Sequence, residues 1–208
     1  MMMSPHTRTA TTKTIGVVLA GGRSTRMGTD KAALRIDNES LLQRAQRVLQ
    51  EAGCERVVLS GHPRTEWHGD CVPDQFPGAG PVGGIISALR WATALTGSGT
   101  AVLFVPVDAP RLSPALLARL LHSDSSNEGC VVTGSPLPIM LRPSDAVLKQ
   151  ASIAAMDLQT GLSWSVKRFI EPLKLTPIEA DDTIRSLLVN VNTPAQWEDL
   201  CREFENCS

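Results

Sequence analysis

The segment IGVVLAGGRSTRMGTDKAAL, residues 15–34, decides the fold of this chain. It opens with the apolar run IGVVL at 15–19 and then turns at Ala20, Gly21 and Gly22 into a polar loop. A short apolar run that ends at glycine is typical of a buried strand in a parallel sheet. We therefore expect the rest of the chain to be built around this strand and its glycine turn.

The polar loop after the glycines carries the cations Arg23, Arg26 and Lys31 and one carboxylate, Asp30. Glycines allow a backbone to turn tightly and to bring its N–H groups close to a ligand. Together with cations at the carboxyl end of a strand, such a loop suits a polyphosphate. Its glycine spacing matches neither G-x-G-x-x-G nor the P-loop, which ends in G-K-[ST]. An ordinary strand–turn–helix junction with solvated cations stays open as an alternative.

The overall composition is that of an ordinary globular protein. The chain has 208 residues, is 42% hydrophobic and 20% charged, and carries a formal net charge of −1. Such a charge gives no global basic field that would attract nucleic acid or an anionic membrane, so any anion site must be local. Aromatic residues are scarce, with four Phe, four Trp and no Tyr, which argues against base-stacking platforms. We expect neither a nucleic-acid nor a membrane partner.

The cysteines and the first residues of the chain bear on where the protein works. There are five cysteines, an odd number with no C-x-x-C spacing, which favours reduced thiols over a disulfide framework or a zinc site. Residues 1–13 lack the apolar core of a signal peptide. We expect residues 1–13 to form a disordered tail, residues 14–208 to form one domain, and the protein to be cytoplasmic.

Downstream of the glycine turn, apolar runs alternate with amphipathic segments. Further strands are expected at 57–59, 101–105, 130–133, 139–141 and 186–189. Helices are expected at 41–52, 82–92, 114–121, 145–151, 162–170 and 194–204. Ser40, Ser113 and Thr193 are suited to be their N-caps. This alternation predicts a three-layer, Rossmann-like α/β fold with a mostly parallel central sheet and ligands at the carboxyl ends of its strands.

Asp108 is a candidate metal ligand. It follows the expected strand at 101–105 and stands between Pro106 and Pro110, which would keep its loop rigid. An aspartate at the end of a buried strand is well placed to bind Mg²⁺ together with substrate phosphates. An aspartate that merely initiates a turn fits the same pattern. Combined with the cationic loop, Asp108 favours phosphoryl or nucleotidyl transfer, which needs charge clamps, a metal and positioning but no covalent nucleophile.

Asn190 and Asn192 form the third candidate element. If the segment 190–192 continues the expected strand, the two amides share a face and point together into a cleft, where they could bind a polar substrate. The alternative is a strand end that leads into the Thr193 cap.

These motifs resemble those of the molybdenum cofactor guanylyltransferases, within the larger group of nucleotidyltransferases with a Rossmann-like sheet. The shared motifs are L-A-G-G-x-S-x-R-M-G-x-D-K at 19–31, Asp74, G-P-V-G-G-I at 80–85, P-x-D-x-P at 106–110 and N-V-N-T-P at 190–194. The resemblance implies transfer of GMP from GTP to the phosphate of molybdenum-bound molybdopterin. The products would be the guanine dinucleotide form of the cofactor and pyrophosphate, with Mg²⁺ as the cofactor of the reaction.

Carried over by position, the resemblance also implies roles for individual residues. The residues expected at GTP are Leu19, Ala20, Gly21, Gly22, Lys31, Ser60, Asp74 and Asp108. Lys31, Arg26 and Asp108 would be catalytic, and Asp108 would hold Mg²⁺. Asn190 and Asn192 would lie towards the pterin. The chain departs from the family at Ser60, where Asn is frequent, and at Val107, where Cys is common.

Several rival functions stay open at this point. Relatives that use CTP tend to read L-A-A-G where this chain reads L-A-G-G at 19–22, which favours GTP over a cytidylyltransferase. A sugar-phosphate nucleotidyltransferase and a GTP-binding module without catalysis are further alternatives. A dinucleotide-dependent oxidoreductase lacks its glycine fingerprint here. Proteins of cofactor biosynthesis and molybdoenzyme maturation are the expected protein partners, and the expected state is a monomer or a weak homo-oligomer.

Overall fold

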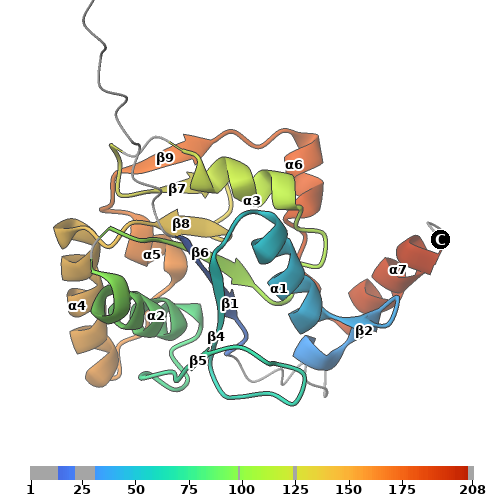
Figure 1. Cartoon of the computed structure of the whole chain (residues 1–208), viewed down its shortest axis with the longest axis horizontal. Helices are drawn as coiled ribbons and strands as arrows, with labels where there is room; N and C mark the ends of the chain where they lie inside the picture. The colour runs from blue at the N-terminus through green and yellow to red at the C-terminus, as the bar shows by residue number, and fades with distance from the viewer. Residues whose placement is uncertain (1–13, 22–30, 98, 124–125, 206–208) are drawn as a thin grey trace, which may run out of the picture.

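The computed structural model describes residues 14–21, 31–97, 99–123 and 126–205 (Figure 1). Within these ranges, seven strands form one sheet in the order β5-β4-β1-β6-β8-β7-β9. Their bounds are Thr14–Leu19 for β1, Arg56–Ser60 for β4, Cys71–Val72 for β5, Ala101–Pro106 for β6, Gly129–Val132 for β7, Ile139–Leu141 for β8 and Leu175–Ile178 for β9. The expected tail at 1–13 and the predicted site residues Gly22 and Arg26 lie outside the described residues.

The central sheet is mostly parallel, as the sequence predicts. Strand β1 pairs in parallel with β4 on one side and β6 on the other. Strand β4 continues in parallel to β5, and β7 pairs in parallel with β9. Among the described strands of this sheet, β8 alone runs against its neighbours, β6 and β7. The predicted fold class is therefore confirmed.

Helices cover both faces of the sheet, which explains why the strands read as unbroken apolar runs. One face carries α1 (Leu41–Glu51), α3 (Pro114–Leu121) and α6 (Asp182–Leu187), and the other carries α2 (Pro81–Thr96), α4 (Asp145–Gln159) and α5 (Val166–Ile170). Along β1, Val18 packs in the first cluster, whereas Val17 and Leu19 pack in the second. Alternate residues of a strand point to opposite faces, so β1 needs apolar side chains throughout.

A small substructure lies beside the sheet, at the right of Figure 1. The short 3-10 helix η1 (Lys31–Ala33) leads into the hairpin of β2 (Arg35–Ile36) and β3 (Glu39–Ser40). Its turn residues Asp37 and Asn38 both have positive φ, 50° and 65°, as two-residue hairpin turns favour. The last helix, α7 (Pro194–Glu205), packs here in an apolar cluster of Ile36, Leu41, Val191 and Leu200. The end of the chain is thereby joined to the segment that follows the glycine loop.

One predicted element is wrong: residues 186–189 do not form a strand. Residues up to Leu187 belong to α6, which the Asp181 side chain caps by accepting a hydrogen bond from the Ile184 N–H at 2.7 Å. The edge strand is instead β9, which is hard to recognise as a strand from the sequence because it contains Pro177. Proline has no N–H to donate to a ladder and is tolerated in edge strands. The adjoining helices also differ from expectation, since α4 extends to Gln159 and α5 begins only at Val166.

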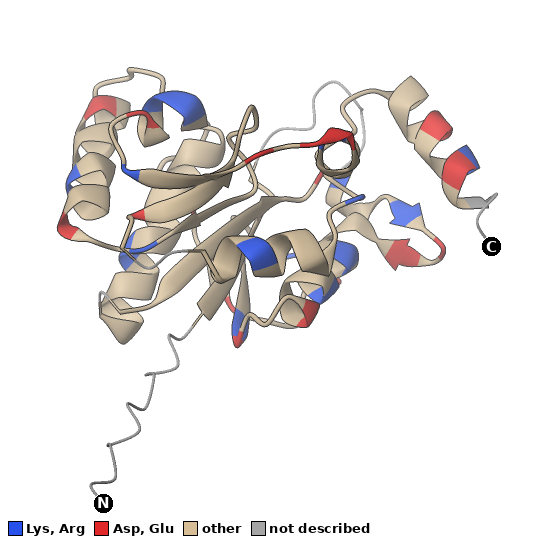
Figure 2. Ribbon diagram, turned by 90° about the horizontal axis from the view of Figure 1, so that it is seen from above, with Lys and Arg blue, Asp and Glu red and all other residues tan. Residues whose placement is uncertain are grey.

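Charged residues lie mainly on the helices and connecting loops around the central strands, as Figure 2 shows from above. Both signs are interspersed, in keeping with the net charge of −1. No helix in the described ranges is both long and apolar enough to cross a membrane.

Burial raises the pKa of the Cys54 thiol to about 12, so this thiol stays protonated at neutral pH.

Candidate functional site

The carboxyl ends of β1, β4 and β6 meet at one edge of the sheet. In the parallel register, Leu19 lies opposite Ser60 on β4 and opposite Pro106 on β6. The chain therefore leaves all three strands at the same level, which brings Gly21 and Asp108 to the same edge. A crevice at the carboxyl ends of parallel strands is the usual ligand site of open α/β sheets.

Three of the predicted residues form one polar cluster at this edge. The ammonium Nζ of Lys31 lies 3.2 Å from Asp108 Oδ2 and donates a hydrogen bond of 2.8 Å to Asn192 Oδ1. The three side chains come from η1, from the loop after β6 and from the segment before α7. The Lys31 and Asp108 side chains are 16% and 22% exposed, so the pair is partly shielded from water yet open to a ligand. A cation, a carboxylate and an amide thus converge on one point.

The segment that carries Asn190 and Asn192 is not a strand, and it leads into the Thr193 cap, the alternative that the sequence left open. The Val191 N–H nevertheless donates to the Asp108 carbonyl at 2.8 Å, and its side chain is only 2% exposed. Asn190 and Asn192, on either side of it, are both exposed. Exposed Asn190 and Asn192 thus alternate with buried Val191, and the Val191 N–H and side chain fix the segment between them.

The N-terminus of α2 forms the opposite wall of the edge. Asp74 lies there, and its Oδ1 accepts a hydrogen bond of 2.8 Å from the Phe76 N–H. A Cβ on Gly21 would lie 3.9 Å from Asp74 Oδ2, so this carboxylate faces the glycine turn. The N-cap of α2 is Gly80, which provides no side-chain hydrogen bond to the first turn. The first N–H groups of such a helix are suited to an anionic ligand.

Two adjacent glycines allow α2 to pack closely, Gly83 against the loop before the helix and Gly84 against the sheet. A Cβ on Gly83 would lie 2.9 Å from both Asp74 Oδ1 and the Phe76 carbonyl oxygen. A Cβ on Gly84 would lie 2.6 Å from Ser60 Oγ. Ser60 itself is 1% exposed, because α2 covers it. The structure therefore places Ser60 beneath the wall rather than in the polar cluster.

The carbonyl groups of Leu19 and Ala20 at the strand end are already hydrogen-bonded within the protein. Both residues are 7% exposed. The Leu19 carbonyl accepts from the Val107 N–H at 3.2 Å, and the Ala20 carbonyl accepts from Arg64 Nη2 at 2.8 Å. Gly21, the next residue, is exposed. The accessible backbone of the predicted nucleotide loop therefore begins at Gly21 in the described part of the chain.

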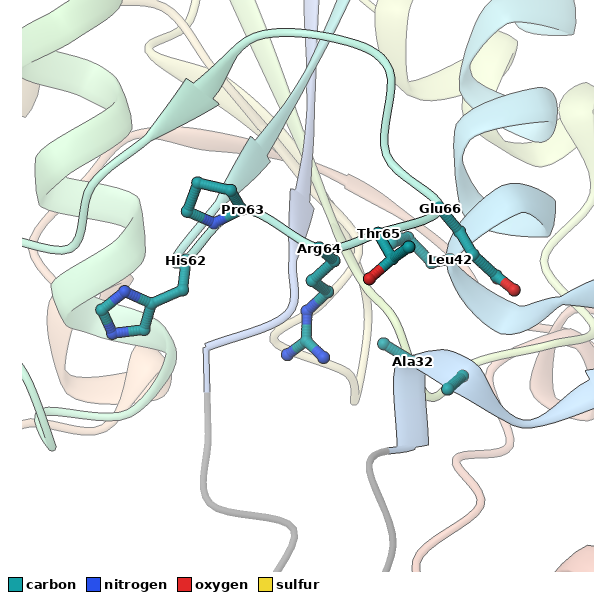
Figure 3. A pocket seen from close by; sticks show the side chains of 8 residues that line it. Ala32, Leu42, His62, Pro63, Arg64, Thr65 and Glu66 are labelled. Atoms are coloured by element: carbon teal, nitrogen blue, oxygen red, sulfur yellow. The ribbon is translucent and has the colours of Figure 1, made fainter.

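Arg64 is a residue of this edge that sequence reasoning missed. It lines a cavity of about 550 Å³ between the β4–β5 loop at 62–66, Ala32 and Ala33 of η1, and Leu42 of α1 (Figure 3). Its side chain lies alongside the end of β1. Burial lowers the pKa of Arg64, but a guanidinium remains charged at neutral pH. The signal in the sequence is weak: a cation in the loop that follows a buried strand.

The described residues offer no ready-made metal cage. Within these residues, no group of three His, Cys, Asp or Glu side chains is close enough to hold a metal ion. A single carboxylate, Asp108, stands at the polar cluster. One carboxylate fits a Mg²⁺-type ion that takes its remaining ligands from water and substrate phosphates.

Comparison with known proteins identifies the family. The model of the MobA-like NTP transferase domain matches residues 16–173. The molybdenum cofactor guanylyltransferase of Xanthomonas euvesicatoria pv. vesicatoria (strain 85-10) is 39% identical over 189 residues, 90% of this chain and 94% of that protein.

Two solved structures share the fold. Molybdopterin-guanine dinucleotide biosynthesis protein A from Archaeoglobus fulgidus has a TM-score of 0.70 at 18% identity, over 93% of this chain and 98% of that one. Rv0371C from Mycobacterium tuberculosis H37Rv, in complex with manganese, has a TM-score of 0.57 at 18% identity, over 92% and 99%. The predicted resemblance is confirmed: this chain belongs to the MobA-like NTP transferase family.

Proposed function

We propose that this protein transfers GMP from GTP to the phosphate of molybdenum-bound molybdopterin. The products are the guanine dinucleotide form of the cofactor and pyrophosphate. The observation that carries the proposal is the convergence of Lys31, Asp108 and Asn192 at the carboxyl edge of the sheet. It occurs in a chain that is 39% identical to a protein named molybdenum cofactor guanylyltransferase.

In this proposal, GTP lies across the edge between the polar cluster and α2. Backbone groups of residues 19–22 contact the nucleotide, with Gly21 as their exposed member among the described residues. Asp74 faces Gly21 and contacts the guanosine portion. Ser60 is buried beneath α2, so it supports this wall from below. The sequence L-A-G-G in this loop favours GTP over CTP.

On the phosphate side, Lys31 and Arg26 are the proposed cationic contacts and Asp108 is the proposed ligand of Mg²⁺. When bound, this ion neutralises phosphate charge and polarises the phosphoryl oxygens. The Lys31–Asp108 ion pair supports the assignment, because it keeps a cation and a carboxylate at one place before any ligand arrives. The manganese complex of the mycobacterial structure is compatible with a divalent metal in this fold.

The proposed reaction is an in-line displacement. A phosphate oxygen of molybdopterin forms a bond to the α-phosphorus of GTP, and the bond from that phosphorus to the pyrophosphate oxygen breaks. Lys31 and Arg26 stabilise the negative charge on the phosphoryl and leaving oxygens. The incoming phosphate is already anionic, so the chain needs no strong general base. Asn190 and Asn192 are exposed amides on the acceptor side and are the proposed neighbours of the pterin.

The proposal also covers how the chain is organised. Residues 14–208 act as one domain, in which the N-terminal part binds the nucleotide and the C-terminal part binds the acceptor. The substrates GTP and molybdopterin are small molecules, and the reaction takes place in the cytoplasm. Proteins of cofactor biosynthesis and molybdoenzyme maturation are the proposed partners of a monomer or weak homo-oligomer.

The test is direct. The purified protein is incubated with Mg²⁺, molybdopterin and GTP, CTP or ATP in parallel, and both pyrophosphate and the pterin dinucleotide are measured. We expect both products with GTP and little with CTP or ATP. Turnover with CTP and none with GTP would overturn the guanylyl assignment. Tight GTP binding without pyrophosphate from any acceptor would favour a module that binds nucleotide without catalysis.

A further inference from the structure

We propose that Asn192 positions the Lys31 ammonium group for the phosphates of GTP, and that Gln196 in turn positions Asn192. The inference rests on the proposed function for the identity of the nucleotide. It gives Asn192 a role on the nucleotide side of the reaction, beyond the acceptor side to which the sequence motif points. It also brings in Gln196, which none of the sequence motifs singled out.

The first observation is the hydrogen bond to Lys31 itself. The 2.8 Å contact from Lys31 Nζ to Asn192 Oδ1 is shorter than the 3.2 Å contact to Asp108 Oδ2. An amide oxygen is neutral, so it directs the ammonium group without cancelling its charge. Lysine has a flexible stem with considerable rotamer entropy. A fixed acceptor therefore lowers the entropic cost of holding the ammonium where a phosphate binds.

The second observation is that the backbone before Asn192 is fixed. The Val191 N–H donates to the Asp108 carbonyl at 2.8 Å. The Val191 side chain is buried with Ile36 and Leu200, which anchors the segment to the hairpin and to α7. Asp108 and Asn192, which both contact the Lys31 ammonium, are therefore also linked through a backbone hydrogen bond.

The third observation is that the backbone at Asn192 is fixed as well. Gln196 Oε1 accepts hydrogen bonds from the Asn192 N–H at 2.8 Å and the Thr193 N–H at 3.1 Å. In return, the Gln196 N–H donates to Thr193 Oγ1 at 3.2 Å. This reciprocal arrangement is a capping box at the start of α7, extended by one residue to Asn192. An exposed side chain whose backbone is held on both sides is preorganised for its contact.

A double-mutant cycle tests the Asn192–Lys31 link. GTP affinity of the full chain is measured by titration with Mg²⁺ and without acceptor, in wild type, N192A, K31A and the double variant. We expect N192A to weaken GTP binding about tenfold, the size of one charge-assisted hydrogen bond. In the K31A background the same change should cost less than about twofold, because the group that Asn192 positions is gone. A tenfold loss in both backgrounds would overturn the inference.

Steady-state kinetics separates this role from contact with the acceptor. A positioning role predicts that N192A raises the KM for GTP, whether or not the KM for molybdopterin changes as well. The reverse pattern, a raised KM for molybdopterin with unchanged GTP affinity, would show that Asn192 serves the acceptor alone and would overturn the inference.

The role of Gln196 has a matched control in the same capping box. Q196A removes both acceptor bonds to the backbone at Asn192 and Thr193, and we expect about threefold weaker GTP binding. T193A removes the hydrogen bond that Thr193 Oγ1 accepts from the Gln196 N–H and leaves Gln196 Oε1 in place. It should lower the thermal midpoint without changing GTP affinity. Q196E keeps the oxygen acceptor and should restore the affinity that Q196A loses. Equal GTP affinities in Q196A and T193A would overturn the Gln196 part.

The outcomes separate this inference from the proposed function. GTP affinity is measured without the acceptor, so coupling between Lys31 and Asn192 in a protein that forms no dinucleotide would overturn only the proposed reaction. Guanylyl transfer by the wild type, with additive effects of the two substitutions on GTP affinity, would overturn only the positioning role.

Discussion

Asp108 and Asn192 contact the same ammonium group, but the molecule holds them in different ways. Asp108 follows β6, whose residues 102–105 are fully buried between β1 and β8. Asn192 lies in an irregular segment that depends on the hydrogen bond from the Val191 N–H to the Asp108 carbonyl, on the bond from its own N–H to Gln196 Oε1, and on the buried Val191 side chain. One side of the site is therefore fixed by the sheet, whereas the other side is fixed by a few local contacts.

The largest effect is expected from Asp108→Asn, which keeps the shape of the sheet-held side but removes its charge. We expect kcat/KM for guanylyl transfer to fall by about 10³-fold, equivalent to about 4 kcal/mol, because the proposed metal ligand is lost. The thermal midpoint is the control and should stay close to wild type, because the side chain is not in the core. Transfer at near-normal rates would exclude Asp108 as the metal ligand.

A smaller loss is expected from Lys31→Ala, which removes the group that both sides contact. We expect kcat/KM to fall by about 10²-fold, or about 2.7 kcal/mol, because charge on the phosphoryl oxygens is less well stabilised. Steady-state kinetics with varied GTP measures this fall in kcat/KM. Arg185→Ala is the control, since Arg185 is 66% exposed and pairs only with exposed Asp182 among the contacts described. Equal rates in the two variants would contradict the role of Lys31.

Gly83→Ala probes how rigid the α2 wall is, on the other side of Gly21 from the polar cluster. The added Cβ would lie 2.9 Å from the Phe76 carbonyl oxygen, a backbone atom that cannot move away easily. We expect the free energy of unfolding to fall by about 2 kcal/mol in urea denaturation. Gly99→Ala is the matched control, because a Cβ there meets nothing within 4 Å. If both variants unfold at the same urea concentration, the α2 wall is more adaptable than we infer.

The smallest effect is expected from Arg64→Ala. The change removes the hydrogen bond to the Ala20 carbonyl and should raise the KM for GTP about fivefold, or about 1 kcal/mol, because the peptide before Gly21 is less well fixed. Arg64→Lys should recover little, since an ammonium does not reproduce the geometry of the guanidinium fork. A KM unchanged in both variants would restrict Arg64 to a structural role in the cavity wall.

The sheet-held side was largely predictable because its signals are local. Unbroken apolar runs indicate strands covered on both faces, and Val17, Val18 and Leu19 do pack alternately into the two clusters. Parallel register then brings the strand ends together, which explains why Lys31 and Asp108 could be paired from motifs alone. The capping serines at 40 and 113 likewise begin helices where expected.

The other side was predicted less well because its structure depends on distant partners. Leu187 looks like part of a strand, but Asp181 caps a helix instead. Strand β9 contains Pro177 and exists because β7 offers it an edge. The contact between Lys31 and Asn192 joins residues 161 positions apart, and no local sequence pattern predicts this contact. Arg64 was missed for the same reason, since its partner Ala20 lies 44 positions away.

The packing of α7 against the β2–β3 hairpin has a consequence for the order in which the protein matures. Ribosomes synthesise the hairpin well before Val191 and Leu200, which complete its apolar cluster. A nascent chain can form β1, η1 and β6 long before Asn192 exists. The complete Lys31–Asp108–Asn192 cluster therefore forms only after residue 192 has been synthesised, and the apolar cluster that anchors this segment needs Leu200 of α7 as well.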